Sequence, residues 1–273
     1  MRRQVAVFVG ALTLMTTVLA NPASAEAPPN DLVENATVIG ALPYTIEQDI
    51  RGATKSDGEL KPKCDRGTRG TVWWTLTAPA DGWLVADTKG SKIRTVAAVY
   101  SGTPDALTRV ACNDDTYREG GNSSKARVYW EATAGTQYYI QVAKDYGKGG
   151  DLKLTVAETG PPFTVESFDV DRRGSVDNQT GVATLSGAVT CANGVGRVNI
   201  SVSITQRIGR LLLSDEARDT FTCEGVHPWQ LRFRSDSGLF TGGTVDVTGR
   251  VSWQGGTEGS FRLTPTTSQL TGG

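Results

Sequence analysis

The sequence predicts an all-β protein made of two β-sandwich domains in tandem. Short stretches in which apolar and polar residues alternate recur through residues 71–156 and again through residues 197–263. Such alternation places one face of each strand against a core and the other face toward solvent. Gly, Asp, Asn and Pro separate the stretches, as expected for tight turns, and no helical period interrupts them. The motif Gly-Pro-Pro, at residues 160–162, lies between the two groups of stretches.

Residues 1–25 have the features of a signal peptide. Two arginines make the start basic, residues 5–20 form an apolar run, and residues 23–25 give the Ala-Ser-Ala pattern that signal peptidase accepts. The run is too short for a typical membrane-spanning helix. No cysteine follows it directly, since the first is Cys64. We therefore expect a secreted, extracellular protein that has no membrane attachment after removal of the signal.

We assign residues 26–159 to the first β-sandwich. Alternation predicts which of its side chains form the core, because every second residue of a strand points to the same face. We expect residues 132–136 to form a turn between two antiparallel strands, with Gly135 free to take a positive φ. The predicted core positions are Val72, Trp74, Leu76, Tyr138, Ile140, Val142, Leu152, Leu154 and Val156.

Six short pieces follow one another in this first half: PPND and ENA in residues 28–36, GAT in 52–54, VWWTLTAP in 72–79, AVYSG in 98–102, VACNDD in 110–115 and ATAGTQYYIQV in 132–142. In this order, over about residues 28–158, they resemble the bacterial pre-peptidase C-terminal (PPC) domain family. The resemblance implies a jelly-roll-like β-sandwich. PPC domains usually accompany secreted peptidases and aid secretion, localisation or substrate attachment, and some relatives bind calcium, collagen or polysaccharide. This chain shows no peptidase domain for the module to serve.

Residues 160–162 form the predicted linker, because two prolines cannot continue a strand ladder. Residues 163–273 form the second β-sandwich, whose seven or so short strands and internal pair of cysteines are typical of an immunoglobulin-like domain. Residues 181–187 and 223–229 also resemble an uncharacterised domain of secreted bacterial proteins, which implies no function. The apolar positions of the alternation are Val198, Ile200, Val202, Ile204, Trp229, Leu231, Phe233, Val245, Val247, Val251, Trp253, Phe261 and Leu263.

The sequence has four cysteines. In an exported protein an even number of cysteines indicates disulfides before metal ligands, and no two of these have the spacing of zinc ligands. Four cysteines allow three pairings. We favour Cys64–Cys112 and Cys191–Cys223, because each pair then stays within one domain.

The sequence offers few residues for catalysis. His227 is the only histidine, so a triad or a catalytic zinc site would depend on it. Its place between Cys223 and Trp229, where we expect a turn, favours a half-exposed structural residue. Asp114 and Asp115 are adjacent, so in a strand their carboxylates would diverge instead of forming a glycosidase pair. We therefore expect no catalytic residue and no enzyme, with a carboxylate-dependent secreted hydrolase as the alternative.

Calcium is the one cofactor for which the sequence offers ligands, although none is required. Asn30 and Asp31 lie near the start of the first domain, and Asn113, Asp114 and Asp115 lie on a loop. Their side chains supply the hard oxygen ligands that calcium needs, six to eight in number. The PPC resemblance implies a site near Asn30 and Asp31. The alternative is that all of these residues serve as turn-forming Asx residues.

Aromatic side chains provide a candidate ligand surface. Trp73 and Tyr139 fall opposite the predicted core positions, and Tyr117 and Tyr146 lie in Gly-rich loops. Exposed aromatic rings supply a large contact area with few rotatable bonds. The alternative is that Trp73 and Tyr139 pack beneath a neighbouring loop or the other domain.

The net charge is −1 at pH 7, which gives the chain no electrostatic reason to bind nucleic acid. We expect a secreted, non-catalytic binding or accessory protein that recognises an extracellular polysaccharide or protein, with calcium as a stabiliser. The alternatives are the secreted hydrolase and a calcium-dependent structural or surface-interaction module. The sequence assigns neither a ligand to the second domain nor an oligomeric state.

Overall fold

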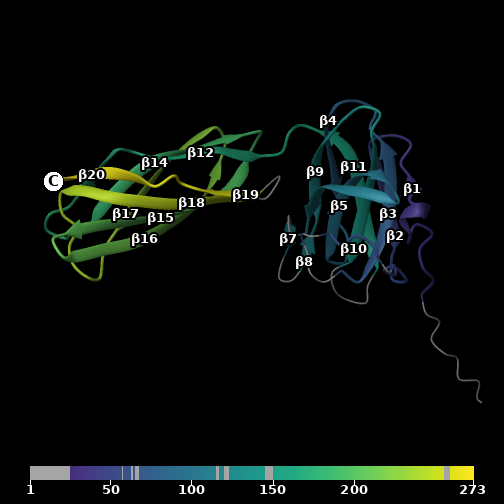
Figure 1. Cartoon of the computed structure of the whole chain (residues 1–273), viewed down its shortest axis with the longest axis horizontal. Helices are drawn as coiled ribbons and strands as arrows, with labels where there is room; N and C mark the ends of the chain where they lie inside the picture. The colour runs from purple at the N-terminus through teal and green to yellow at the C-terminus, as the bar shows by residue number, and fades with distance from the viewer. Residues whose placement is uncertain are drawn as a thin grey trace, which may run out of the picture.

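The computed structural model describes residues 25–56, 58–62, 64, 68–114, 117–119, 123–144, 150–254 and 259–273. Within these ranges the protein is all-β, as predicted, and its strands form sandwich-like layers in two bodies (Figure 1). The one described helix is the short 3-10 helix η1 (Val33–Asn35). Nothing in the described ranges is a helix long and apolar enough to cross a membrane. The expected signal peptide lies outside the described residues, apart from Ala25.

The first body is formed by β1 (Thr37–Val38), β2 (Tyr44–Asp49), β3 (Gly70–Thr77), β4 (Gly82–Asp87), β5 (Thr95–Thr103), β6 (Ala106–Asn113), β7 (Tyr117–Glu119), β8 (Ser123–Lys125), β9 (Arg127–Ala132), β10 (Gln137–Lys144) and β11 (Asp151–Thr159). Its larger sheet has the strand order β1-β3-β10-β5-β6, and its smaller sheet has the order β2-β11-β4-β9. A separate ribbon pairs β7 with β8. Apart from β1, which runs parallel to β3, neighbouring strands in these sheets are antiparallel.

The core of the first body lies between its two sheets and matches the prediction. All of the predicted core positions from Val72 to Val156 are buried in a single apolar cluster. In the larger sheet, Ile140 of β10 pairs with Trp74 of β3 on one side and with Val99 of β5 on the other. The alternation therefore identified the inner face of this sheet correctly.

The outer face of the larger sheet is also covered. Seven of the eight residues of β3 are buried, including Trp73, Thr71 and Thr75. On this face Trp73, Ala98, Tyr100 and Tyr139 form a second buried group, which we call the outer cluster. Partly buried side chains from the N-terminal segment and from β6 pack against the outer cluster: Val33, Ala36, Leu107 and Cys112.

The predicted turn at residues 132–136 is present, but it does not join two neighbouring strands. Gly135 has a φ of +75°, and its N–H donates to the carbonyl of Ala78 at 2.9 Å. The flanking strands, β9 and β10, belong to different sheets. The expectation of an antiparallel pair was therefore wrong. This connection instead carries the chain from one layer to the other, as some connections in any sandwich must.

The second body is formed by β12 (Thr164–Val170), β13 (Arg173–Val176), β14 (Ala183–Ala192), β15 (Gly196–Ile208), β16 (Leu211–Cys223), β17 (Val226–Phe233), β18 (Gly243–Gln254), β19 (Gly259–Arg262) and β20 (Thr266–Gly272). The strand order is β12-β14-β13-β20-β18-β15-β16, with β17 paired to β14 and β19 to β18. Val198 to Ile204 alternate in burial as predicted, and Trp229, Leu231 and Phe233 are buried. Phe261 and Leu263 are partly buried and pack against the core.

Both predicted disulfides are formed. The Cα atoms of Cys64 and Cys112 are 5.9 Å apart, and those of Cys191 and Cys223 are 6.2 Å apart. The first bridge ties the segment that precedes β3 to β6. The second joins β14 to β16. Paired cysteines indicate folding in an oxidising compartment.

Candidate functional site

A cavity of about 330 Å³ lies beside the outer cluster of the first body. Three stretches of chain that are far apart in sequence meet there around Trp73 of β3, and we call the cavity the Trp73 pocket. They are residues 32–34 at η1, residues 56 and 58–60 before β3, and residues 104–107 at the turn between β5 and β6. The lining residues are Leu32, Val33, Glu34, Ser56, Gly58, Glu59, Leu60, Trp73, Pro104, Asp105, Ala106 and Leu107.

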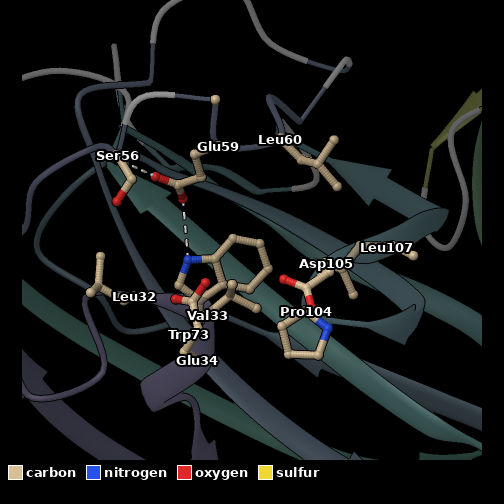
Figure 2. A pocket seen from close by; sticks show the side chains of 12 residues that line it. Leu32, Val33, Glu34, Ser56, Glu59, Leu60, Trp73, Pro104, Asp105 and Leu107 are labelled. Carbon is tan, nitrogen blue, oxygen red and sulfur yellow. Dashed lines mark hydrogen bonds between the residues drawn. The ribbon is translucent and has the colours of Figure 1, made fainter.

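Glu59 holds the indole ring of Trp73 in place (Figure 2). Its Oε1 accepts hydrogen bonds from Trp73 Nε1 at 3.2 Å and from Gln141 Nε2 at 2.9 Å. The Thr71 hydroxyl donates to the same oxygen, and the N–H of Ser56 donates to Oε2 at 3.0 Å. Hydrogen bonds to an ionised carboxylate are stronger than bonds between neutral groups. Glu59 therefore ties the stretch before β3 to β3 and β10.

Tyr100 extends this buried network. Its hydroxyl donates to Gln141 Oε1 at 2.9 Å, and its ring centroid lies 5.7 Å from that of Trp73. Burial raises the pKa of Tyr100 to about 12; the positive charge of Arg109 lowers this pKa slightly, and the negative charge of Glu59 raises it slightly. The phenol is therefore a neutral donor at physiological pH, and the polar groups behind the outer cluster have partners.

Asn30 and Asp31, two of the predicted calcium ligands, attach the N-terminal segment to the sheet. Asn30 Nδ2 donates to the carbonyl of Trp73 at 3.0 Å, and Gln48 Nε2 donates to Asn30 Oδ1 at 2.7 Å. The two oxygens of Asp31 accept from the N–H and the hydroxyl of Thr54, at 2.7 and 2.5 Å. These bonds place Leu32 to Glu34 beside Trp73.

Of the other predicted calcium ligands, Asn113 is the last residue of β6, and Asp114 follows it directly. Asn113 is buried, and its Oδ1 accepts from the N–H of Arg127 at 3.4 Å. Asp115 lies outside the described residues. Among the side chains that the structure describes, no group of three or more His, Cys, Asp or Glu could hold a metal ion, and no hydrogen bond joins Asn30 or Asp31 to Asn113. The calcium site stays a prediction.

Two of the aromatic side chains predicted to form a ligand surface are buried. Trp73 is 1% exposed and Tyr139 is 5% exposed, so neither ring presents an open face. Both pack in the outer cluster, under the N-terminal segment and β6, which corresponds to the alternative stated for them. Trp73 still reaches the lining of the pocket. The side chain of Tyr117, and Tyr146 as a whole, lie outside the described part of the chain.

Sequence reasoning did not select Glu34, Glu59, Leu60 or Asp105. One signal could have pointed to this region: Trp73 and Trp74 are adjacent in a strand, so large apolar side chains emerge on both faces. Such a strand needs a cover on each side. The signal indicates that Trp73 is covered, but it does not identify the covering segments.

His227 of β17 stacks on Phe221 of β16. Their ring centroids are 4.1 Å apart, and the ring planes are inclined by 13°. The imidazole is partly exposed, and no carboxylate or serine in the described ranges hydrogen-bonds to it. His227 therefore lies within β17 (Val226–Phe233) and not in the expected turn, and its ring packs against β16, a strand with which β17 is not paired.

The sequence matches no protein-family model and no curated protein. Three solved structures with similarity are β-glucuronidase 3 of Bacteroides uniformis (10% identity, TM-score 0.25), β-glucuronidase of Parabacteroides merdae (13%, 0.24) and a glycosyl hydrolase family 2 member of Bacteroides cellulosilyticus (13%, 0.24). The matches cover 73%, 74% and 72% of this chain. They span 27%, 28% and 28% of those chains. TM-scores this low carry no argument about fold or function.

Proposed function

We propose that the chain is a secreted, non-catalytic binding or accessory protein that recognises an extracellular polysaccharide or protein through its first body. The two disulfides favour an oxidising compartment, and the signal-peptide pattern of residues 1–25 supports export. The resemblance of residues 28–158 to PPC domains supports a module that attaches to a target. The two-layer arrangement of the first body is compatible with the jelly-roll-like sandwich that this resemblance implies.

The observation that carries the proposal is the Trp73 pocket. Its volume of about 330 Å³ falls within the roughly 300–1,000 Å³ of small-ligand sites. Its walls combine apolar side chains with a few polar groups, which is the usual composition of a binding site. The hydrogen bonds of Glu59 and Asn30 hold the walls in place before any ligand arrives, and such preorganisation favours binding.

Retention on insoluble targets tests this function. The whole chain is passed over cellulose, chitin, bacterial cell wall and collagen, and we expect retention on at least one. The variant Leu32→Ala/Leu60→Ala truncates two pocket side chains that are 39% and 41% exposed, and should reduce retention several-fold. Leu239→Ala, at a 56% exposed leucine of the second body, is the control and should be retained normally. Failure to bind any target would contradict the proposal.

A secreted hydrolase is the second candidate, because Glu34, Glu59 and Asp105 line one pocket. Most glycosidases act through a pair of carboxylates. A screen of glycosides and esters should show activity that Glu34→Gln or Asp105→Asn abolishes, if the pocket is catalytic. Activity that survives both substitutions would exclude these two carboxylates from the chemistry.

Calcium-dependent stabilisation is a further proposal, supported by the oxygen ligands at Asn30, Asp31 and residues 113–115. A ligand that binds only the folded state raises the melting midpoint. A midpoint that rises in millimolar calcium and returns with chelator would support the site. An unchanged midpoint would remove it.

We also propose that the second body is an immunoglobulin-like domain. β12 pairs with β14 alone, whereas β13 pairs antiparallel with β14 and parallel with β20. The pairings β14–β17 and β20–β18–β15–β16 support two layers of such a sandwich, which β13 joins into one continuous sheet. The disulfide departs from the antibody pattern, since it joins β14 to β16.

A further inference from the structure

The Trp73 pocket has an uneven chemical composition. Half of its described lining residues are Leu, Val, Ala or Pro, and the charged residues among them are all acidic: Glu34, Glu59 and Asp105. None of the twelve lining residues that the structure describes is a lysine, arginine or histidine. A ligand that fills this cavity therefore meets apolar walls and negative charge together.

The three carboxylates differ in how many of their oxygens can still accept a hydrogen bond from a ligand. Glu59 already accepts hydrogen bonds from Trp73, Gln141 and Ser56. Glu34 and Asp105 are exposed, and neither forms an ion pair within the described part of the chain. Their acceptor oxygens are available to a ligand.

Glu34 and Asp105 also come from different walls. Glu34 belongs to η1, and Asp105 lies in the turn between β5 and β6. Figure 2 shows Glu34 in front of Trp73. Asp105 and Pro104 lie together to one side of the Trp73 ring (Figure 2). Both residues line the same cavity, so a group that fills it meets carboxylates that two different chain segments supply.

One class of ligand matches this composition. A lysine or arginine side chain has an aliphatic stem, which packs on apolar surface, and a cationic end that carries only hydrogen-bond donors. Pairing that end with carboxylates gives charge-assisted hydrogen bonds. An anionic ligand would be repelled, and a neutral aliphatic one would leave the carboxylates without new partners.

We propose that the Trp73 pocket binds a lysine or arginine side chain of an extracellular polypeptide. This inference rests on the proposed function and narrows it: the target is a protein with an exposed basic residue. The same chemistry occurs in free alkylamines, so the two sources must be separated by experiment.

Titration calorimetry of the whole chain with blocked tripeptides tests the ligand class. The probes are acetyl-Ala-X-Ala-amide with X as lysine, arginine, norleucine or glutamate, together with n-butylamine as the free amine. We expect the lysine or arginine peptide to bind at least tenfold more tightly than the norleucine peptide, and the glutamate peptide not to bind. Binding should weaken as salt rises from 50 to 500 mM, because exposed charges are screened. Tighter binding of the peptide than of butylamine would identify the polypeptide as the source.

A matched pair of variants assigns the binding to the pocket. Glu34→Gln/Asp105→Asn removes both available charges at exposed positions, and should weaken binding of the basic peptide tenfold or more. Glu131→Gln/Glu158→Gln, at exposed positions in the smaller sheet, changes the net charge equally and should leave binding unchanged. Thermal melts of both variants show whether each remains folded.

The possible failures are distinguishable. Equal affinity for the lysine and norleucine peptides, equal losses in both double variants, or no binding of any probe at millimolar concentration would overturn the inference. The proposed function survives such a result if the chain is still retained on a solid target and the Leu32→Ala/Leu60→Ala variant is not. If retention is absent as well, both fail.

Discussion

Glu59 is the side chain at which the parts of the Trp73 pocket converge. Its bonds reach Thr71 and Trp73, 12 and 14 positions along the chain, and Gln141, 82 positions along. No local pattern in the sequence marks such a residue, because its role depends on where β3 and β10 meet. Trp73 was predictable to a greater degree: alternation correctly placed it opposite the core, but could not show what covers it.

The high pKa of Tyr100 makes a prediction about alkaline stability. An ordinary tyrosine has a pKa of 10.0, and burial raises that of Tyr100 to about 12. Between pH 10 and pH 12 the unfolded chain therefore loses this proton while the folded protein keeps it, so the free energy of unfolding falls as pH rises. The stabilisation is fully present below pH 10, and about 2 kcal/mol of it should be lost by pH 12.

Urea unfolding of the wild type and of Tyr100→Phe at pH 9 to 12 measures this effect. The variant loses the hydrogen bond to Gln141 at every pH, but its stability should fall less steeply between pH 10 and pH 12. Tyr44→Phe, at a partly exposed tyrosine, is the control and should keep the wild-type slope. Equal slopes in wild type and Tyr100→Phe would contradict the assignment.

Strand faces were the most predictable feature of the elements. In β11 and β15 the burial of side chains follows the alternation of the sequence, because one face of each strand packs on a core. The expectation that residues 132–136 join two paired strands was wrong, because a local pattern does not show which sheet each strand enters. A turn signal shows that the chain reverses direction, but the same signal serves a hairpin and a crossing between layers.

Gly187 of β14 lies where β12 and β17 leave no room for a side chain, so a substitution there should destabilise the protein. It pairs with Val170 of β12 and with Trp229 of β17. A Cβ atom there would collide with the carbonyl oxygen of Asp169 and lie 2.6 Å from the Trp229 ring. Gly187→Ala should therefore destabilise the second body by about 1–3 kcal/mol, as overpacking usually does.

Chemical denaturation followed by tryptophan fluorescence checks the Gly187 prediction. The matched control is Gly242→Ala, where the nearest atom to the added Cβ is 3.6 Å away and no strain arises. We expect the control to unfold within about 0.5 kcal/mol of wild type. A Gly187→Ala protein as stable as the control would show that β12 and β17 can move apart at little cost.

The described residues form two separate main apolar cores, apart from the outer cluster of the first body. One consists of residues between Ile39 and Val156, and the other of residues between Phe163 and Leu270. The Gly-Pro-Pro stretch at residues 160–162 lies between them in sequence, where the composition predicted a linker. We therefore predict that the two bodies unfold as separate units. Removing one disulfide at a time can test this, because each bridge lies within the residue range of a single core.

We expect calorimetry to resolve two thermal transitions, and each disulfide to affect one of them. The Cys191–Cys223 bridge closes 32 positions, for which the loop-entropy relation gives about 3.5–4 kcal/mol of stabilisation. Cys191→Ala/Cys223→Ala should lower one midpoint by more than roughly 10 °C and leave the other in place. Cys64→Ala/Cys112→Ala should do the reverse. If both midpoints moved together in either variant, the two bodies would unfold as one cooperative unit, and the predicted boundary at residues 160–162 would be wrong.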